Sequence, residues 1–177
     1  MPLVSNGQII ADQFVRVLDD APLPANGGVL IPAERLLSDP ALLDDHKRPV
    51  GVLWPNNRNI GELAPYIDRL AMVALVFPNF RDGRGYSQAR LLRERYGFDG
   101  ELRATGEVLR DQFLFLVRAG FDTFEVAKDK DAQAFVAALD RFSVFYQPTG
   151  VSLPFAGQLR QRRNGAAQNQ DRLQAVG

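Results

Sequence analysis

The middle of the chain alternates between short apolar runs and segments with helical spacing. The apolar, β-prone runs are VGVLW (50–54), MVALVF (72–77), GELRA (100–104), DTFEV (122–126) and SVFYQ (143–147). The segments between them place apolar residues three and four positions apart, at 60–70, 87–97, 106–120 and 130–142. Strands that alternate with helices are typical of βα units. The pattern predicts an α/β fold with a parallel sheet of about five βα units, arranged as a partial barrel or as a flavodoxin-like sheet.

Residues 1–48 follow a different pattern. Asn6-Gly7 lies between two short β-prone runs, which predicts a β hairpin. The run GVLIP (28–32) predicts a strand, and residues 33–45 predict a helical segment that is disturbed by Pro40. We therefore expect an N-terminal hairpin and flanking helix at 1–48 and a βα core at 49–148 that forms one domain with it. The polar segment 149–177 is predicted to be a disordered tail.

Several residues mark the expected helix ends. Gly97 and Gly120 follow predicted helices and suit left-handed C-terminal caps. Ser87 and Thr105 are predicted to be N-caps of the helices that follow them, because hydroxyl side chains accept hydrogen bonds from free N–H groups.

The composition excludes several kinds of chemistry. The 177 residues contain no Cys and one His, which excludes disulfides, thiolate nucleophiles and cysteine-bound iron–sulfur clusters, and no metal site is predicted. The formal net charge is +0, which argues against a nucleic-acid binder that works through bulk positive charge. The chain has no apolar run of about 18 residues and no signal-like start, so we expect a cytoplasmic protein outside the membrane.

The best candidate for a site is the stretch FPNFRDGRGYS (77–87). Parallel sheets bind ligands outside the carboxyl ends of their strands, and this stretch follows a predicted strand. Its two glycines are expected to take positive φ and bring backbone N–H groups close to an oxyanion, while its arginines offer paired donors. The predicted ligand-binding residues are Asn79, Arg81, Gly83, Gly85, Ser87, Thr105, Arg110 and Gln112.

If the site is catalytic, the same loop supplies the reacting groups. Tyr86 would donate a proton, Arg84 would neutralise substrate charge and Asp82 would hold Arg84 in place. In the alternative interpretation the loop is scaffold, and Asp82 and Arg84 form a structural ion pair. Neither a G-x-G-x-x-G nor a P-loop motif is present, so no cofactor is indicated, although a flavin remains open.

The motifs DGRGYS, LRERYG and GELRATGEVLRDQ, all within residues 77–126, resemble a proteobacterial family catalogued as DUF934. The resemblance extends from about Asn6 to Gln147. It implies a predicted oxidoreductase of sulfite reduction, because such proteins tend to be encoded beside sulfite reductase and the reductase of activated sulfate. Family members often carry Cys where this chain has Ala119, and this departure argues against a mechanism that needs a redox thiol.

Three functions remain open at this point. The first is an accessory or oxidoreductase-like protein of assimilatory sulfate and sulfite reduction, which binds an anionic sulfur metabolite or docks on sulfite reductase or the activated-sulfate reductase. The second is a small α/β enzyme, a flavin- or nicotinamide-dependent reductase or a lyase, with an anionic substrate. The third is a non-catalytic protein-interaction module. A partial sheet can also complete itself with a second copy, which leaves a homodimer open.

Overall fold

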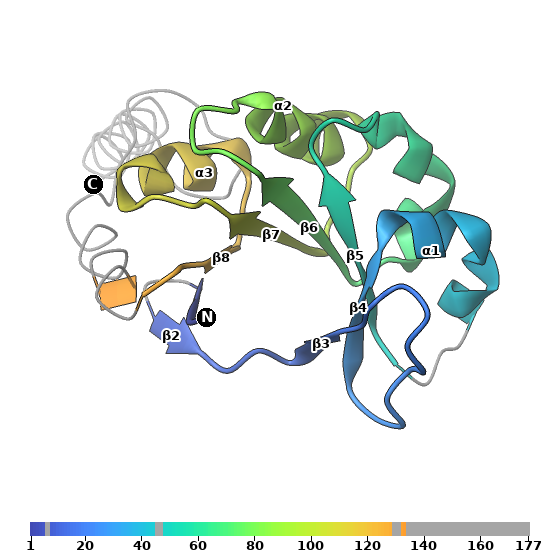
Figure 1. The fold of residues 1–177 in the computed structure, drawn as a ribbon. Coiled ribbons are helices and arrows are strands. Elements are labelled where there is room, and N and C mark those ends of the chain that lie inside the picture. The colour runs from blue at the N-terminus through green and yellow to red at the C-terminus, as the bar shows by residue number, and fades with distance from the viewer. Residues whose placement is uncertain (6–7, 45–47, 129–131, 134–177) are drawn as a thin grey trace, which may run out of the picture.

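The computed structural model describes residues 1–5, 8–44, 48–128 and 132–133 and shows a curled sheet with helices on its outer side (Figure 1). Eight strands form the sheet in the order β2-β1-β8-β7-β6-β5-β4-β3. They are β1 (Leu3–Ser5), β2 (Gln8–Ile10), β3 (Phe14–Arg16), β4 (Gly28–Pro32), β5 (Val50–Pro55), β6 (Met72–Phe77), β7 (Glu101–Gly106) and β8 (Thr123–Glu125).

The six strands β3 to β8 are parallel and lie side by side in the order of the sequence. Parallel crossovers are right-handed, so strands in sequential order carry all their crossover segments on one side, and the sheet curls with its concave side inward. The protein is therefore a half-barrel, which confirms the partial-barrel alternative. A flavodoxin-like sheet would instead reverse its strand order and carry helices on both faces.

The predicted helical segments are present, but several are not regular α-helices. The α-helices are α1 (Ala33–Ser38), α2 (Arg84–Arg90) and α3 (Phe113–Ala119). Residues Ile60–Arg69 form a 3₁₀ helix that contains Pro65, and α2 continues as a π-helical turn at Leu91–Arg95. The interruption predicted at Pro40 is also confirmed, since α1 ends at Ser38 and a 3₁₀ turn starts at Pro40.

The helix ends agree only in part with the sequence. Gly97 and Gly120 have φ values of 63° and 104° after their helices, as predicted. The N-cap predictions for Ser87 and Thr105 are wrong. Ser87 lies inside α2, which begins three residues earlier, and Thr105 lies within β7. In both cases regular secondary structure extends on either side of the hydroxyl residue. The residue type alone therefore did not locate the boundary of the element.

The sheet separates two groups of side chains. The main core lies between the outer face of the sheet and the helices, where strand residues such as Trp54, Leu75 and Phe77 pack with Leu36 and Leu116. On the concave face, β3 to β6 carry a smaller apolar cluster. Strands β7 and β8 carry polar and charged side chains on that same concave face.

The first sixteen residues reach both edges of the sheet. The predicted N-terminal hairpin is confirmed: β1 pairs antiparallel with β2, and β1 also pairs antiparallel with β8. Only residues 11–13 connect β2, at one edge, with β3, at the other edge. Figure 1 shows this connection passing across the open side of the curled sheet. The outer edge of β8 is thus occupied by β1, whereas the predicted strand 143–147 and the predicted tail 149–177 lie outside the described residues.

Candidate functional site

A cavity of about 520 Å³ lies at the carboxyl ends of β6, β7 and β8. We call it the carboxyl-rim cavity. This is the edge where parallel α/β sheets hold ligands. The loop after β6 contributes one wall, and the loop after β7 contributes most of the lining. Ala127, which follows β8, completes the lining. The lining residues are Phe80, Gly106, Glu107, Val108, Leu109, Arg110, Asp111 and Ala127.

Phe80 is held in place by the loop after β7. Its backbone N–H donates to Glu107 Oε2 at 3.1 Å, and its carbonyl accepts from Gln112 Nε2 at 2.6 Å. Gln112 Oε1 in turn accepts from the Leu109 N–H at 3.2 Å. Both backbone polar groups of Phe80 are therefore satisfied by side chains of one neighbouring loop, which fixes the position of an aromatic residue at the cavity wall.

Charged groups of both signs surround this cavity. Arg110 lines it and lies 3.5 Å from the carboxylate of Asp111, and both side chains are largely exposed. The guanidinium of Arg81 lies over the Phe80 ring, 5.3 Å from its centroid. Exposed ion pairs contribute little free energy, so Arg110 is able to exchange its neighbour for an anionic ligand at small cost.

Asp82 and Arg84 satisfy each other. Arg84 Nη2 donates to Asp82 Oδ2 at 2.6 Å, and Arg84 Nε donates to Oδ1 at 3.0 Å. These hydrogen bonds hold the pKa of the Asp82 carboxyl well below its usual range. Asp82 is therefore ionised at neutral pH. This suits the predicted role of Asp82 in holding Arg84 in place and does not suit proton transfer by this carboxyl.

Tyr86 faces inward instead of toward the carboxyl-rim cavity. Its ring is half-buried and contacts Phe77 edge-on, with ring centroids 5.5 Å apart. Burial raises the pKa of the Tyr86 hydroxyl. The catalytic roles of Asp82, Arg84 and Tyr86 stay predictions, and none of the three lines the cavity.

The two loop glycines differ from the expectation of positive φ. Gly83 has φ of −77°, and the positive-φ glycines of the described residues do not include Gly85. Gly85 is instead required by space, because a Cβ atom there would lie 2.6 Å from the Phe77 ring. The glycine with the special backbone is Gly106, which lines the cavity at φ of 97°.

The other predicted ligand residues are distributed over different surroundings. Asn79 Oδ1 accepts from the Arg81 N–H at 2.9 Å, so this side chain shapes the loop. Ser87 is exposed on α2. Thr105 is buried on the concave face, where its hydroxyl donates to Glu125 Oε2 at 2.5 Å. Of the predicted set, Arg110 alone lines the cavity, and Gln112 supports its wall.

Sequence reasoning missed a cluster of ion pairs on the concave face, which we call the barrel-face network. Its centre is Arg103, whose side chain is 1% exposed. Arg103 donates to both Asp12 carboxylate oxygens at 2.7 and 3.0 Å, to Glu101 at 2.9 Å and more weakly to Glu125 at 3.4 Å. The network consists of Asp12, Arg16, Glu101, Arg103, Thr105, Thr123 and Glu125.

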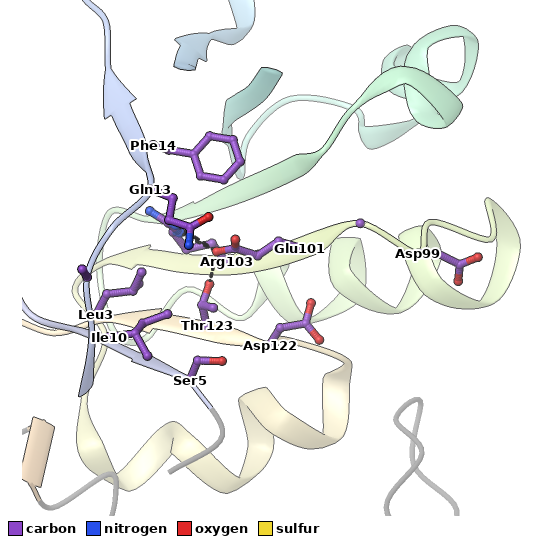
Figure 2. Close-up of a pocket in the computed structure, with 12 residues that line it drawn as sticks. Leu3, Ser5, Ile10, Gln13, Phe14, Asp99, Glu101, Arg103, Asp122 and Thr123 are labelled. Atoms are coloured by element: carbon purple, nitrogen blue, oxygen red, sulfur yellow. Dashed lines mark hydrogen bonds and ion pairs between the residues drawn. The ribbon is translucent and has the colours of Figure 1, made fainter. Parts of the chain in front are cut away.

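A second cavity of about 520 Å³ opens beside this network at the amino ends of β7 and β8. Figure 2 shows Glu101 between Arg103 and Thr123, with Phe14 on one wall and Asp99 and Asp122 farther along. The Arg103 guanidinium is already satisfied by carboxylates, so it has no donor left for an anion. This second cavity therefore does not suit the oxyanion that the sequence suggested.

The signal for the network was present in the sequence as a two-residue alternation. Glu101, Arg103 and Thr105 occupy every second position of β7, and Thr123 and Glu125 do so in β8. Side chains two apart in a strand lie on one face of a sheet. The pairing of Arg103 with Thr123 in the sheet then places the polar positions of β7 beside those of β8.

In the part of the chain that the structure describes, no group of three Asp, Glu or His side chains comes together in a way that would hold a metal ion. No helix in these residues has both the length and the apolar character needed to cross a bilayer.

Comparisons with known proteins give one family. The model of a bacterial protein of unknown function, DUF934, matches residues 51–155, which include β5 from its second residue, β6 to β8 and both loops of the carboxyl-rim cavity. The match starts later than Asn6 and therefore leaves the N-terminal hairpin and β4 outside it. No protein among those with curated descriptions matches the chain.

Proposed function

We propose that this chain, which belongs to the DUF934 family of bacterial proteins of unknown function, is an accessory protein of assimilatory sulfate and sulfite reduction. In this proposal it binds an anionic sulfur metabolite in the carboxyl-rim cavity. The observation that carries the proposal is the position of this cavity, at the ligand-binding edge of a parallel sheet and beside two arginines, Arg81 and Arg110.

The chemistry of the cavity supports an anionic ligand. Guanidinium groups donate paired hydrogen bonds that match the oxygens of sulfite, sulfate and their esters. Within the described residues, Arg81 contacts the Phe80 ring and has no carboxylate partner, so its charge is free for a ligand. Arg84 is less suited to this role, because Asp82 already occupies its donors.

Calorimetric titration tests the proposal. The purified protein is titrated with sulfite, sulfate and adenosine 5′-phosphosulfate at fixed low ionic strength, and at least one of them is expected to bind. Arg110→Ala should weaken that binding about tenfold, because it removes one charged donor. Arg95→Ala is the matched control, since Arg95 ends the π-helical turn that follows α2 and does not line the cavity. No binding of any of the three probes would refute the proposal.

A genetic experiment tests the pathway separately from the ligand. Deletion of the gene is expected to cause cysteine auxotrophy that sulfide relieves, because sulfide enters cysteine synthesis after the reduction steps. Complementation with Arg110→Ala should be poorer than complementation with Arg95→Ala. Normal growth of the deletion strain on sulfate as sole sulfur source would argue against a role in this pathway. Co-purification with sulfite reductase or the activated-sulfate reductase would identify the partner.

A further inference from the structure

We propose that the ligand of the carboxyl-rim cavity is a nucleotide, whose base stacks on Phe80 while its anionic group binds Arg110 and Arg81. This inference rests on the proposed function, since it concerns the same site, and it names the chemical class of the ligand. A sulfur oxyanion would then be recognised as part of a nucleotide phosphosulfate, a mixed anhydride, and not as a free inorganic ion.

The size of the cavity favours a ligand larger than an inorganic oxyanion. Sulfite or sulfate takes up roughly the volume of two or three water molecules, on the order of 60–90 Å³. The cavity has about 520 Å³, which is within the range of sites for molecules the size of a nucleotide. A free oxyanion would leave most of the cavity filled with water.

Phe80 has the properties of a stacking surface. It is 41% exposed, whereas the phenylalanines at 77, 98, 113, 121 and 124 are buried in the core. A single exposed apolar side chain is ordinary on a protein surface. The backbone of Phe80, however, is fixed on both sides by Glu107 and Gln112. Because the backbone of Phe80 is already fixed, only the side-chain freedom of its ring is lost when a ligand stacks on it.

The polar groups around Phe80 match the mixed character of a nucleotide. Arg110 and the adjacent Arg81 offer charged donors, and Glu107 and Asp111 offer carboxylate acceptors. A small dianion would meet repulsion from the two carboxylates. A nucleotide carries hydroxyl and amino donors as well as an anionic group, so it is able to use charges of both signs. The loop after β7 supplies both kinds of partner.

The test compares four probes and three variants by calorimetric titration. The probes are adenosine 5′-phosphosulfate, adenosine 5′-monophosphate, sulfate and sulfite. Both nucleotides are expected to bind at least tenfold more tightly than sulfate. Phe80→Ala should weaken nucleotide binding about tenfold or more and leave any sulfate binding unchanged, and Phe80→Trp should restore it, because base stacking needs an aromatic face.

Phe115→Ala is the matched control. Phe115 is 61% exposed on α3 and does not line the cavity, so its removal deletes an equal aromatic area without changing the site. Circular dichroism and thermal unfolding confirm that each variant is folded. Saturation-transfer NMR adds a direct readout, since saturation of the Phe80 ring protons should reach the adenine protons in the wild type and in Phe115→Ala but not in Phe80→Ala.

The outcomes separate this inference from the proposed function. The nucleotide inference is overturned if sulfate or sulfite binds as tightly as the nucleotides, or if Phe80→Ala binds the nucleotides as tightly as the wild type does. In either case the proposed function stands. If adenosine 5′-monophosphate binds as well as the phosphosulfate and neither inorganic ion binds, the inference stands and the sulfur specificity of the proposed function fails. If no probe binds, the proposed function fails and this inference fails with it.

Discussion

Arg103 is a buried cation that depends on its carboxylate neighbours. Its side chain is 1% exposed and is surrounded by Asp12, Glu101 and Glu125. The attraction within such a cluster mainly offsets the cost of removing the charges from water. Loss of the arginine would leave carboxylates close together in a poorly solvated place, which is far more costly than loss of an exposed ion pair.

We therefore expect Arg103→Leu to lower the free energy of unfolding by about 3–5 kcal/mol. The control is Arg90→Ala, which breaks an exposed pair with Glu94 at 3.6 Å and should change stability by less than about 1 kcal/mol. Urea unfolding followed by circular dichroism measures both. Similar small losses in the two variants would show that the barrel-face network contributes little to stability.

The ionisation of Asp82 gives a second prediction at the scale of single residues. Because Arg84 lowers the pKa of this carboxyl, the titration midpoint of Asp82 should lie below the ordinary value of about 3.9. The stabilising contribution of the pair is present above the unfolded-state pKa and is lost as the pH falls through the folded-state pKa. Carboxyl-detected NMR on wild type and Arg84→Ala measures the midpoint.

In Arg84→Ala the midpoint of Asp82 should rise toward the ordinary value, and in Arg90→Ala it should not move. Ionisation throughout the neutral range agrees with a positioning role for Asp82. A midpoint near pH 7 would contradict the ion pair and would make Asp82 a candidate for proton transfer.

At the scale of the elements, the glycine with a positive φ at the carboxyl rim is Gly106, which the sequence did not single out. Gly106 ends β7 with φ of 97°, and a Cβ atom there would lie 2.4 Å from the Phe77 carbonyl oxygen. Gly83 has an ordinary φ of −77° and open space around it. The glycine-rich appearance of the loop after β6 therefore did not reveal which backbone position is constrained.

Gly106→Ala is expected to lower the free energy of unfolding by at least about 1–3 kcal/mol from backbone strain, and the close approach to Phe77 adds to this loss. It should also weaken ligand binding, because Gly106 lines the carboxyl-rim cavity. Gly83→Ala should be neutral or slightly stabilising. Thermal unfolding of both variants provides the comparison, and equal stability of the two would contradict this account of the turn.

The regular elements were the most predictable part of the molecule. The run MVALVF became β6 without change of boundary, and Asn6-Gly7 marked the hairpin, because continuous apolar runs and turn residues act locally. The 3₁₀ geometry of Ile60–Arg69 was not predicted. It depends on Pro65 and on packing against the sheet, and hydrophobic periodicity does not report either the exact hydrogen-bond pattern or the helix type.

The sequence predicted the edge of the sheet for the candidate site better than it predicted which residues line the cavity there. The rule for parallel sheets pointed to the edge where the carboxyl-rim cavity lies, where Arg110 lines the cavity and Gln112 supports its wall. Phe80 was overlooked, because an apolar residue in a charged loop gives no chemical signal by itself. The role of Phe80 emerges only when Glu107 and Gln112, which come from another loop, are seen to hold its backbone.

At the scale of the whole molecule, the segment between β2 and β3 links the two edges of the half-barrel. Asp12 in this segment binds Arg103 on β7, and Arg16 on β3 binds Glu125 on β8 at 3.1 Å. Burial by itself would raise the pKa of Asp12, but hydrogen bonds from Arg103 and from the Phe14 N–H lower it overall. The segment thus crosses the concave side and is tied by ion pairs of Asp12 and Arg16 to the inner strands β7 and β8.

Asp12→Ala is expected to loosen both edges of the sheet at once. It removes the contact of the crossing segment with Arg103, so amide hydrogen exchange should accelerate in β2 and in β3, while the central strands β5 and β6 stay protected. The free energy of unfolding should fall by about 1.5–3 kcal/mol, as for hydrogen bonds to a charged group.

Asp44→Ala is the control, since it breaks an exposed pair with Arg69 and should leave exchange in both edge strands unchanged. Amide-resolved NMR provides the measurement. Acceleration in β3 alone would show that the crossing segment does not couple the two edges and that the half-barrel is held together by its strand pairing only.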